Sequence, residues 1–172
     1  MAVEHIKQLK KYKKAHKEKY KDLVILDRGY PSLGLISYMN QENIDYLMRI
    51  QSNIFKEIEA FKDSKLNNTI LEIEITKERL YQITKKDKYP LLRKFRDKLT
   101  IGKTIKVRVL KVVLDTGEIE VLITSLLNSK TYPYSLFKEL YFKRWKIELE
   151  YNIIKNIFKV ENFTGVTQIA IN

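Results

Sequence analysis

The sequence contains no cysteine, which excludes disulfide bridges and thiolate metal sites and fits a reducing cytoplasm. It contains only two histidines, His5 and His16, so neither a histidine-rich metal site nor a Ser-His-Asp triad is expected. No apolar run approaches the length of a transmembrane helix, and no signal-peptide pattern is present. These absences favour a globular cytoplasmic protein that does not span a membrane.

Positive charge, in contrast, is abundant. Lys and Arg number 33 against 21 Asp and Glu, which gives a net charge of +12 and a pI near 9.6 in a chain of 172 residues. Residues 1–21 carry a net charge of +6 and residues 85–98 a net charge of +5. This balance favours a polyanionic partner, either nucleic acid or an anionic membrane surface. The alternative is that the two basic segments are solvent-exposed surfaces that bind no partner.

The hydrophobic pattern of the amino-terminal third predicts a basic helix followed by a βαβ unit. Apolar residues recur at helical spacing over residues 3–20, and the short apolar run DLVILD at 22–27 is typical of a buried strand in a parallel sheet. Pro31 suits the first turn of a helix that extends to about Met39. A second strand is predicted over residues 45–51, which completes the βαβ unit.

The pattern then changes, and residues 52–130 predict a mostly antiparallel β insertion that begins with a short helix. Apolar residues alternate strictly over residues 69–76, as in a half-buried strand. Two further predicted strands, 104–114 and 118–126, flank the turn Asp115-Thr116-Gly117, where glycine suits a positive φ. This turn places six apolar residues on one face: Val107, Val109, Val113, Ile119, Val121 and Ile123.

A long helix without internal Gly or Pro is predicted over residues 135–158. At about 100° per residue, Tyr141, Arg144, Glu148 and Lys155 fall within an arc of about 60° that rises about 21 Å. An ordinary salt bridge between Arg144 and Glu148 would stabilise the helix by about 0.3–0.5 kcal/mol. The alternative is functional, because a carboxylate that ligates Mg²⁺ beside a phosphate needs flanking Arg, Lys or hydroxyl groups.

A metal site of this kind needs at least one more carboxylate, and Asp27 is the best candidate. It follows a predicted strand, and ligands gather at the carboxyl ends of strands in open α/β sheets. A purely structural role in the turn that contains Gly29 is the alternative.

Taken together, these residues resemble the DDE transposases of bacterial insertion sequences, specifically insertion-sequence family four. Tyr141-x2-Arg144-x3-Glu148-x6-Lys155 matches the Y-R-E-K signature of that family. The stretch DRGYPS, residues 27–32, looks like the motif that holds the family's second catalytic Asp. The resemblance extends over most of the chain.

The resemblance implies an α/β (α+β) fold, namely an incomplete ribonuclease-H-like fold with an inserted, mostly antiparallel β subdomain. It implies two divalent metals, Mg²⁺ or Mn²⁺, with Asp27 and Glu148 as catalytic metal ligands. Tyr141, Arg144 and Lys155 would hold DNA phosphates. The implied partner is double-stranded DNA, at transposon ends and target, and the implied reaction is phosphodiester hydrolysis followed by strand transfer. The implied location is the nucleoid of a bacterial cytoplasm.

The predicted organisation has three parts. Residues 1–51 form the ribonuclease-H-like part with the Asp27 strand, and residues 52–130 form the inserted β subdomain. Residues 131–172 carry the catalytic Glu helix, which completes the ribonuclease-H-like part.

The sequence departs from the family at the first catalytic Asp. Only 26 residues precede Asp27, and the single Asp among them, Asp22, lies about 17 Å away at the other end of the same strand. Asp45 opens the next strand, again at the wrong end. We therefore expect a carboxyl-terminal fragment of the catalytic domain that is inactive alone, with an exposed sheet edge that would permit a homodimer.

Two other functions are compatible with the same residues. The first is a non-catalytic, basic nucleic-acid-binding protein, in which Tyr and Phe interleaved with Lys stack on bases. The second is an inert transposon remnant. Metal binding that depends on Glu148 would favour the transposase over both.

Overall fold

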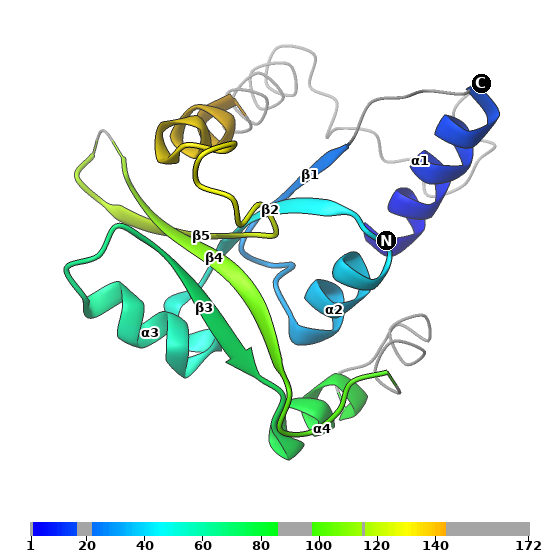
Figure 1. Cartoon of the computed structure of the whole chain (residues 1–172), viewed down its shortest axis with the longest axis horizontal. Coiled ribbons are helices and arrows are strands. Elements are labelled where there is room, and N and C mark those ends of the chain that lie inside the picture. Colours follow the sequence, from blue (N-terminus) through cyan, green and yellow to red (C-terminus); the bar gives the residue numbers. More distant parts are fainter. Residues whose placement is uncertain (1, 17–21, 86–97, 115, 144–172) are drawn as a thin grey trace, which may run out of the picture. The chain divides into compact units, whose positions relative to one another are not determined.

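The computed structural model describes residues 2–16, 22–85, 98–114 and 116–143 (Figure 1). The chain divides into two compact units, one that ends at Tyr134 and one that begins at Ser135, and each is described by itself. The first unit contains every strand that the structure describes, and the second begins within a helical segment over residues 134–143.

The predicted helices and strands of the first unit occur in the predicted order, and two elements that the sequence did not predict, η1 (Ser52–Ile54) and α4 (Lys77–Lys85), lie among them. In chain order they are α1 (Ala2–His16), β1 (Leu23–Leu26), α2 (Leu33–Gln41), β2 (Asp45–Ile50), the 3₁₀ helix η1 (Ser52–Ile54), α3 (Lys56–Asp63), β3 (Asn68–Glu74), α4 (Lys77–Lys85), β4 (Thr104–Val113) and β5 (Ile119–Thr124). The predicted α+β fold class is therefore confirmed.

The strands form one mixed sheet in the order β1-β2-β5-β4-β3. β1 and β2 are parallel, with α2 as the connection between them, so the predicted βαβ unit is present. The other three pairings, β2 with β5, β5 with β4 and β4 with β3, are antiparallel. The strands of residues 52–130 thus continue the sheet that β1 and β2 begin, and the division into a core and an inserted subdomain stays a prediction.

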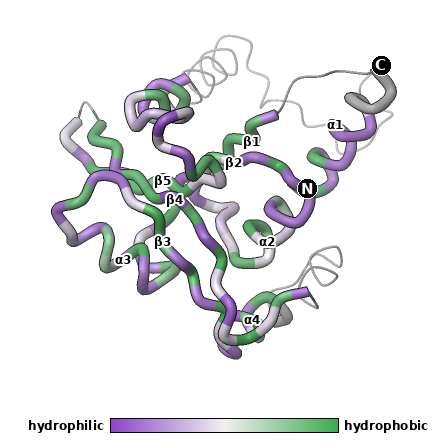
Figure 2. Tube along the Cα trace, viewed as in Figure 1, coloured by the Kyte–Doolittle hydropathy of each residue, from purple (hydrophilic) through white to green (hydrophobic). Residues whose placement is uncertain are grey.

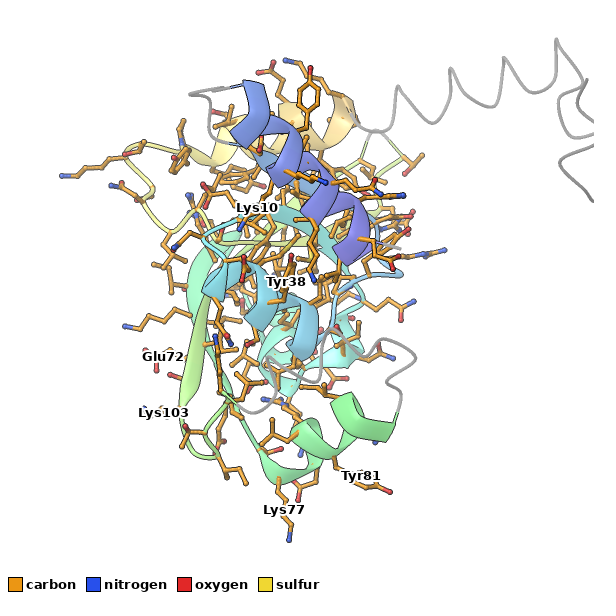
Figure 3. The ribbon with its side chains drawn as sticks, turned by 90° about the vertical axis from the view of Figure 1, so that its right-hand side faces the viewer. Lys10, Tyr38, Glu72, Lys77, Tyr81 and Lys103 are labelled. Carbon is orange, nitrogen blue, oxygen red and sulfur yellow. The ribbon has the colours of Figure 1, made fainter. Side chains whose placement is uncertain are left out.

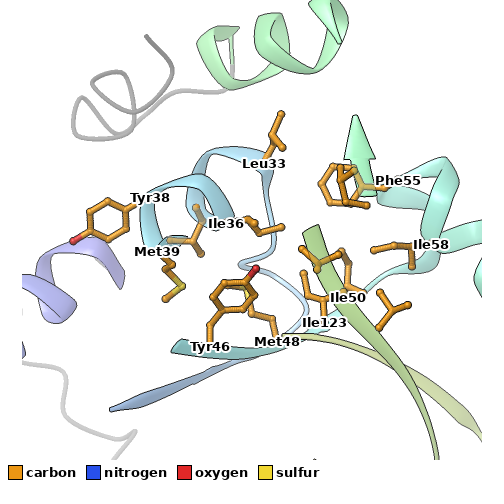
Figure 4. Close-up of a cluster of buried hydrophobic side chains, with 14 of the residues drawn as sticks. Leu33, Ile36, Tyr38, Met39, Tyr46, Met48, Ile50, Phe55, Ile58 and Ile123 are labelled. Carbon is orange, nitrogen blue, oxygen red and sulfur yellow. The ribbon is translucent and has the colours of Figure 1, made fainter. Parts of the chain in front are cut away.

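The main hydrophobic core lies on one face of the sheet, beneath α2 and α3 (Figure 4). Alternate residues of β2 point into it, because successive side chains of a strand face opposite sides. Its most deeply buried members include Ile36, Tyr38, Met39, Tyr46, Met48, Ile58, Ile73, Val107, Val109 and Ile123. The tube coloured by hydropathy shows α1, whose Val3 and Ile6 belong to this core, as a largely hydrophilic helix (Figure 2).

The start of α2 differs in one detail from the prediction. Ser32, with φ −154° and ψ 154°, is the N-cap, and its Oγ accepts a hydrogen bond from the Leu35 N–H at 3.2 Å. Pro31 therefore precedes the cap instead of occupying the first turn. The reason is that a serine hydroxyl can satisfy an unpaired N–H group of the first turn, which the proline cannot do.

The hairpin between β4 and β5 forms at the predicted turn. Gly117 has φ +83°, its N–H donates to the Leu114 carbonyl at 2.9 Å, and the Leu114 N–H donates to the Glu118 carbonyl at 2.9 Å. The register pairs Val109 with Ile123 and Val113 with Ile119, so the predicted apolar face is confirmed. Toward the tip this face emerges from the core, where Val113 and Ile119 are about half exposed.

The other face of the sheet contains buried polar groups. Arg108 of β4 is 1% exposed, and its Nε donates to Asn68 Oδ1 at 2.8 Å. Its Nη1 donates to the carbonyl of Tyr132 at 2.6 Å and, at 3.4 Å, to that of Leu126. Arg108 thus ties the segment that follows β5 to the sheet. Within the described ranges, no helix is long and apolar enough to cross a membrane.

Candidate metal centre

Asp27 comes directly after β1, at the carboxyl end of the parallel pair. Its carbonyl accepts a hydrogen bond from the Tyr30 N–H at 3.1 Å, which closes the turn that leads to α2. The φ of Gly29 lies outside the left-handed region, and nothing lies within 4 Å of a Cβ built on it. The turn therefore does not depend on a glycine at this position.

Strand alternation indicates which side of the sheet Asp27 faces. Val24 and Leu26 pack against the main core, so the side chains of Leu23, Ile25 and, one step further, Asp27 belong to the opposite face. The Asp27 residue itself is partly buried. Of its two carboxylate oxygens, Oδ1 is buried, and the end of the strand fixes the position of the residue.

The register brings a second charged group to the same place. Leu26 pairs with Met48, so the next position along β1, Asp27, lies beside Arg49 of β2. The Arg49 side chain also faces away from the main core. The Arg49 guanidinium forms an ion pair with the carboxylate of Glu120 on β5, through Nε to Oε2 and through Nη2 to Oε1. Asp27, Arg49 and Glu120 thus lie in sequence across β1, β2 and β5.

Neither of the other two nearby acidic residues reaches this end of the sheet. Asp22 precedes β1, and Asp45 pairs with Leu23 at the amino end of β2. Asp45 Oδ1 accepts a hydrogen bond from Ser125 Oγ at 3.0 Å, and that hydroxyl accepts one from the Tyr46 N–H at 3.1 Å. Among the residues that the structure describes, no three His, Cys, Asp or Glu side chains are grouped so that they could hold a metal ion.

Only one of the four signature residues predicted on the long helix lies in the described part of the chain. Tyr141 belongs to the helical segment over residues 134–143, and its side chain is 3% exposed. Arg144, Glu148 and Lys155 lie outside the described residues. Their roles, and that of Tyr141, stay predictions.

Sequence reasoning did not identify Arg49 and Glu120. A signal for Arg49 was available, since it is the single charged residue in the apolar stretch YLMRI between Asp45 and Gln51. No comparable signal marked Glu120, because the alternation of EIEVLIT is also that of an ordinary strand with one solvated face. Only the pairing of β2 with β5 brings the two together.

The chain is thus an α+β protein with a mixed sheet and an acidic residue at the carboxyl end of its parallel pair of strands. A family model described as "Transposase DDE domain" matches residues 2–171. The chain therefore belongs to the transposase DDE domain family, whose members act on DNA. Comparison with curated proteins and with solved structures gave no match.

Proposed function

We propose that this chain carries catalytic-domain residues of a transposase of insertion-sequence family four, which binds transposon and target DNA. The observation that carries the proposal is the position of Asp27, at the carboxyl end of parallel strands in a chain that the transposase family model matches from residue 2 to residue 171. Ligands of open α/β sheets bind outside such strand ends. The ribonuclease-H-like nature of the fold and the place of action, a bacterial nucleoid, belong to the same proposal.

Each proposed residue has a chemical task. The carboxylates of Asp27 and Glu148 would hold Mg²⁺ or Mn²⁺, because these hard cations prefer oxygen ligands. Arg144 would bind a DNA phosphate through two parallel N–H donors, and Lys155 would act on it as a point charge. The Tyr141 hydroxyl would donate to a phosphate oxygen. Together these groups would hold the scissile strand beside the metal site.

The metal, when bound, supplies Lewis-acid stabilisation of charge on the phosphate oxygens and lowers the pKa of bound water. Asp27 fits this role, since its carboxylate is a hard oxygen donor at a partly exposed strand end. On the neighbouring strand, the Arg49 guanidinium forms an ion pair with the Glu120 carboxylate.

We propose further that this chain alone neither cleaves nor transfers DNA strands. Two-metal sites need enough carboxylates to hold both ions, and the proposed ligands here are Asp27 and Glu148. Asp22 and Asp45 belong to the other end of the strands, so neither supplies a third ligand beside Asp27. A homodimer formed through the edge of β1 would not change this, because each copy would bring the same two carboxylates.

Metal binding tests the proposal directly. Titration of the full chain with Mn²⁺, followed by electron paramagnetic resonance, should reveal a site whose affinity falls at least tenfold in Asp27→Asn and in Glu148→Gln. Asp63→Asn is the matched control, because this exposed carboxylate ends α3. Equal binding by the wild type and both site variants would overturn the proposal.

A plasmid-nicking assay tests the proposed inactivity separately. With Mg²⁺ or Mn²⁺ the wild-type chain should leave supercoiled plasmid intact. Nicking that disappears in Glu148→Gln would show that two carboxylates suffice in this protein.

A non-catalytic nucleic-acid-binding protein is the second candidate, and the charge favours it. The chain carries a net charge of +12, and α1 presents exposed lysines. A DNA affinity that rises as the salt concentration is lowered fits both functions. DNA binding without any Mn²⁺ site would favour this second function, and the absence of both would indicate an inert remnant.

A further inference from the structure

One face of α1 is fixed against the rest of the first unit. Val3 and Ile6 are 8% and 5% exposed and belong to the main core. One turn further on, Lys10 Nζ donates to the backbone carbonyl of Glu42 at 2.8 Å and to its carboxylate at 2.9 Å. Figure 3 shows Lys10 on α1 and Tyr38 on the neighbouring α2. These contacts, three and four residues apart, set the rotation of α1 about its own axis.

The remaining surface of α1 is basic and exposed. Lys7 and Lys11 are both exposed and four residues apart, so they are neighbours on the helix surface. Among the described residues neither has an acidic partner, in contrast to Lys10. Leu9 and Tyr12, at 42% and 52% exposure, add apolar surface beside these lysines.

This surface is remote from Asp27. Glu42, which anchors Lys10, lies three residues before β2 begins, and Asp27 lies beyond the opposite, carboxyl end of the strand parallel to it. A strand of six residues such as β2 is about 20 Å long. In Figure 1, α1 accordingly lies beside the start of β2.

We propose that α1 is a docking surface for the backbone of duplex DNA, distinct from the proposed catalytic end of the sheet, with Lys7 and Lys11 in contact with phosphates. The inference deepens the proposed function, on which it rests in taking DNA as the partner. Charge complementarity carries it, because residues 1–21 have a net charge of +6 and DNA presents about one negative charge per 1.7 Å of helix axis.

The same charge disfavours a second copy of this chain as the occupant. Two α1 helices packed face to face would bring two segments of net charge +6 together. Like charges held close together in an interface oppose association. A helix of 15 residues is also of a size that the major groove admits.

The test compares two lysine pairs in the full chain. Binding to a fluorescently labelled duplex is measured by anisotropy over a series of KCl concentrations, for Lys7→Gln/Lys11→Gln and for the control Lys62→Gln/Lys65→Gln. The control removes the same charge from exposed lysines at the end of α3, which packs near the opposite edge strand β3. The α1 variant should bind roughly tenfold more weakly at low salt, and the slope of log K against log salt should fall by about 2.

Each outcome has one meaning. A smaller slope of log K against log salt in the α1 variant, with an unchanged slope in the control variant, supports the docking surface. Equal losses in both variants, or no loss in the α1 variant, overturn it. Tighter binding to anionic lipid vesicles than to the duplex, lost in the α1 variant, would also overturn it in favour of a membrane surface. Mn²⁺ titration of the same variants separates this result from the proposed function, since the α1 variant should keep the metal site.

Discussion

The Arg49 guanidinium on β2 grips the Glu120 carboxylate on β5 through two N–H groups, across neighbouring antiparallel strands. Both side chains are largely removed from water, with 19% and 7% of their surface exposed. The pair lies on the face of the sheet opposite the main core, and Arg49 occupies the position on β2 next to that of Asp27. It therefore joins the parallel part of the sheet to the antiparallel part at the proposed catalytic end.

Removal of one partner of this pair should be costly. In Glu120→Gln a desolvated guanidinium loses its counter-charge, and such a loss typically lowers the free energy of unfolding by about 3–5 kcal/mol. Urea unfolding at neutral pH measures the change. Glu72→Gln is the control, because the Glu72–Lys106 pair is more than half exposed and should contribute less than about 1 kcal/mol. Equal losses of stability in the two variants would show that burial does not determine how much the Arg49–Glu120 pair contributes to the free energy of unfolding.

The Glu57–Arg79 pair should make stability depend on pH in the acid range. Arg79 Nη1 and Nη2 donate to the two Glu57 oxygens at 2.8 Å and 2.7 Å, and this contact lowers the pKa of Glu57 below its usual 4.5. A depressed pKa means that the folded chain binds fewer protons than the unfolded one, so the stabilisation is present above pH 4.5 and is lost as pH falls below it. The wild type should therefore be more stable than Glu57→Gln at pH 6, and the difference should shrink towards pH 3. Glu59→Gln, an exposed neighbour on α3, should show no such convergence.

The sequence predicted most of this sheet because its signals are local. The strict alternation of residues 69–76 and the Asp115-Thr116-Gly117 turn each determine their structure within a few residues. The short apolar run at 22–27 and its place before a helix predicted a parallel pairing, which the register of β1 with β2 confirms. The local pattern could not predict that β5 pairs with β2, because antiparallel partners 71 to 77 residues apart are selected by tertiary packing.

The candidate site was predictable only in part, for the same reason. Asp27 was identified by its place after a strand, a property of its immediate neighbours. Arg49 and Glu120 are recognisable only once two distant strands pair. The burial of Arg108 could not be anticipated either, since the alternation of TIKVRVLKVVL predicts that its side chain faces outward. Arg108 is 1% exposed because the segment after β5 packs over it.

Gly117 should resist substitution although space is available for a side chain. Nothing lies within 4 Å of a Cβ built on it, but its φ of +83° is strained for any residue with a Cβ. Gly117→Ala should lower the free energy of unfolding by about 1–2 kcal/mol, measured by urea denaturation. Gly29→Ala is the matched control, with equal space and an ordinary φ, and should be neutral or stabilising by up to about 1 kcal/mol. The reverse ranking would mean that the β4–β5 turn does not have this backbone conformation.

Tyr46 should limit stability at alkaline pH. Its side chain is fully buried at the centre of the core, and this burial raises the pKa of the phenol well above its usual 10.0. The folded chain then keeps a proton that the unfolded chain releases, so stability is complete below pH 10 and falls by about 1.4 kcal/mol for each further pH unit. Tyr46→Phe should lose less stability between pH 10 and 11 than the wild type, whereas Tyr81→Phe, at a 58% exposed position, should follow the wild type. Identical alkaline profiles for wild type and Tyr46→Phe would show that the phenol ionises in the folded chain.

Arg108 should control the order of the segment between β5 and the helical residues that begin at 134. Its guanidinium donates to Asn68 on one side and to the carbonyls of Leu126 and Tyr132 on the other, which a planar fork with several donors can do at once. Arg108→Lys keeps the charge but offers a single ammonium, so at least one buried carbonyl loses its donor at a cost of about 1–3 kcal/mol. Hydrogen exchange measured by mass spectrometry should show faster exchange in peptides that cover residues 125–134 than in peptides of β1 and β2. Lys106→Arg, an exposed position two residues earlier on β4, should leave both exchange rates unchanged. Uniform acceleration over the whole first unit in Arg108→Lys would instead mean that the residue stabilises the entire sheet and does not act on this segment in particular.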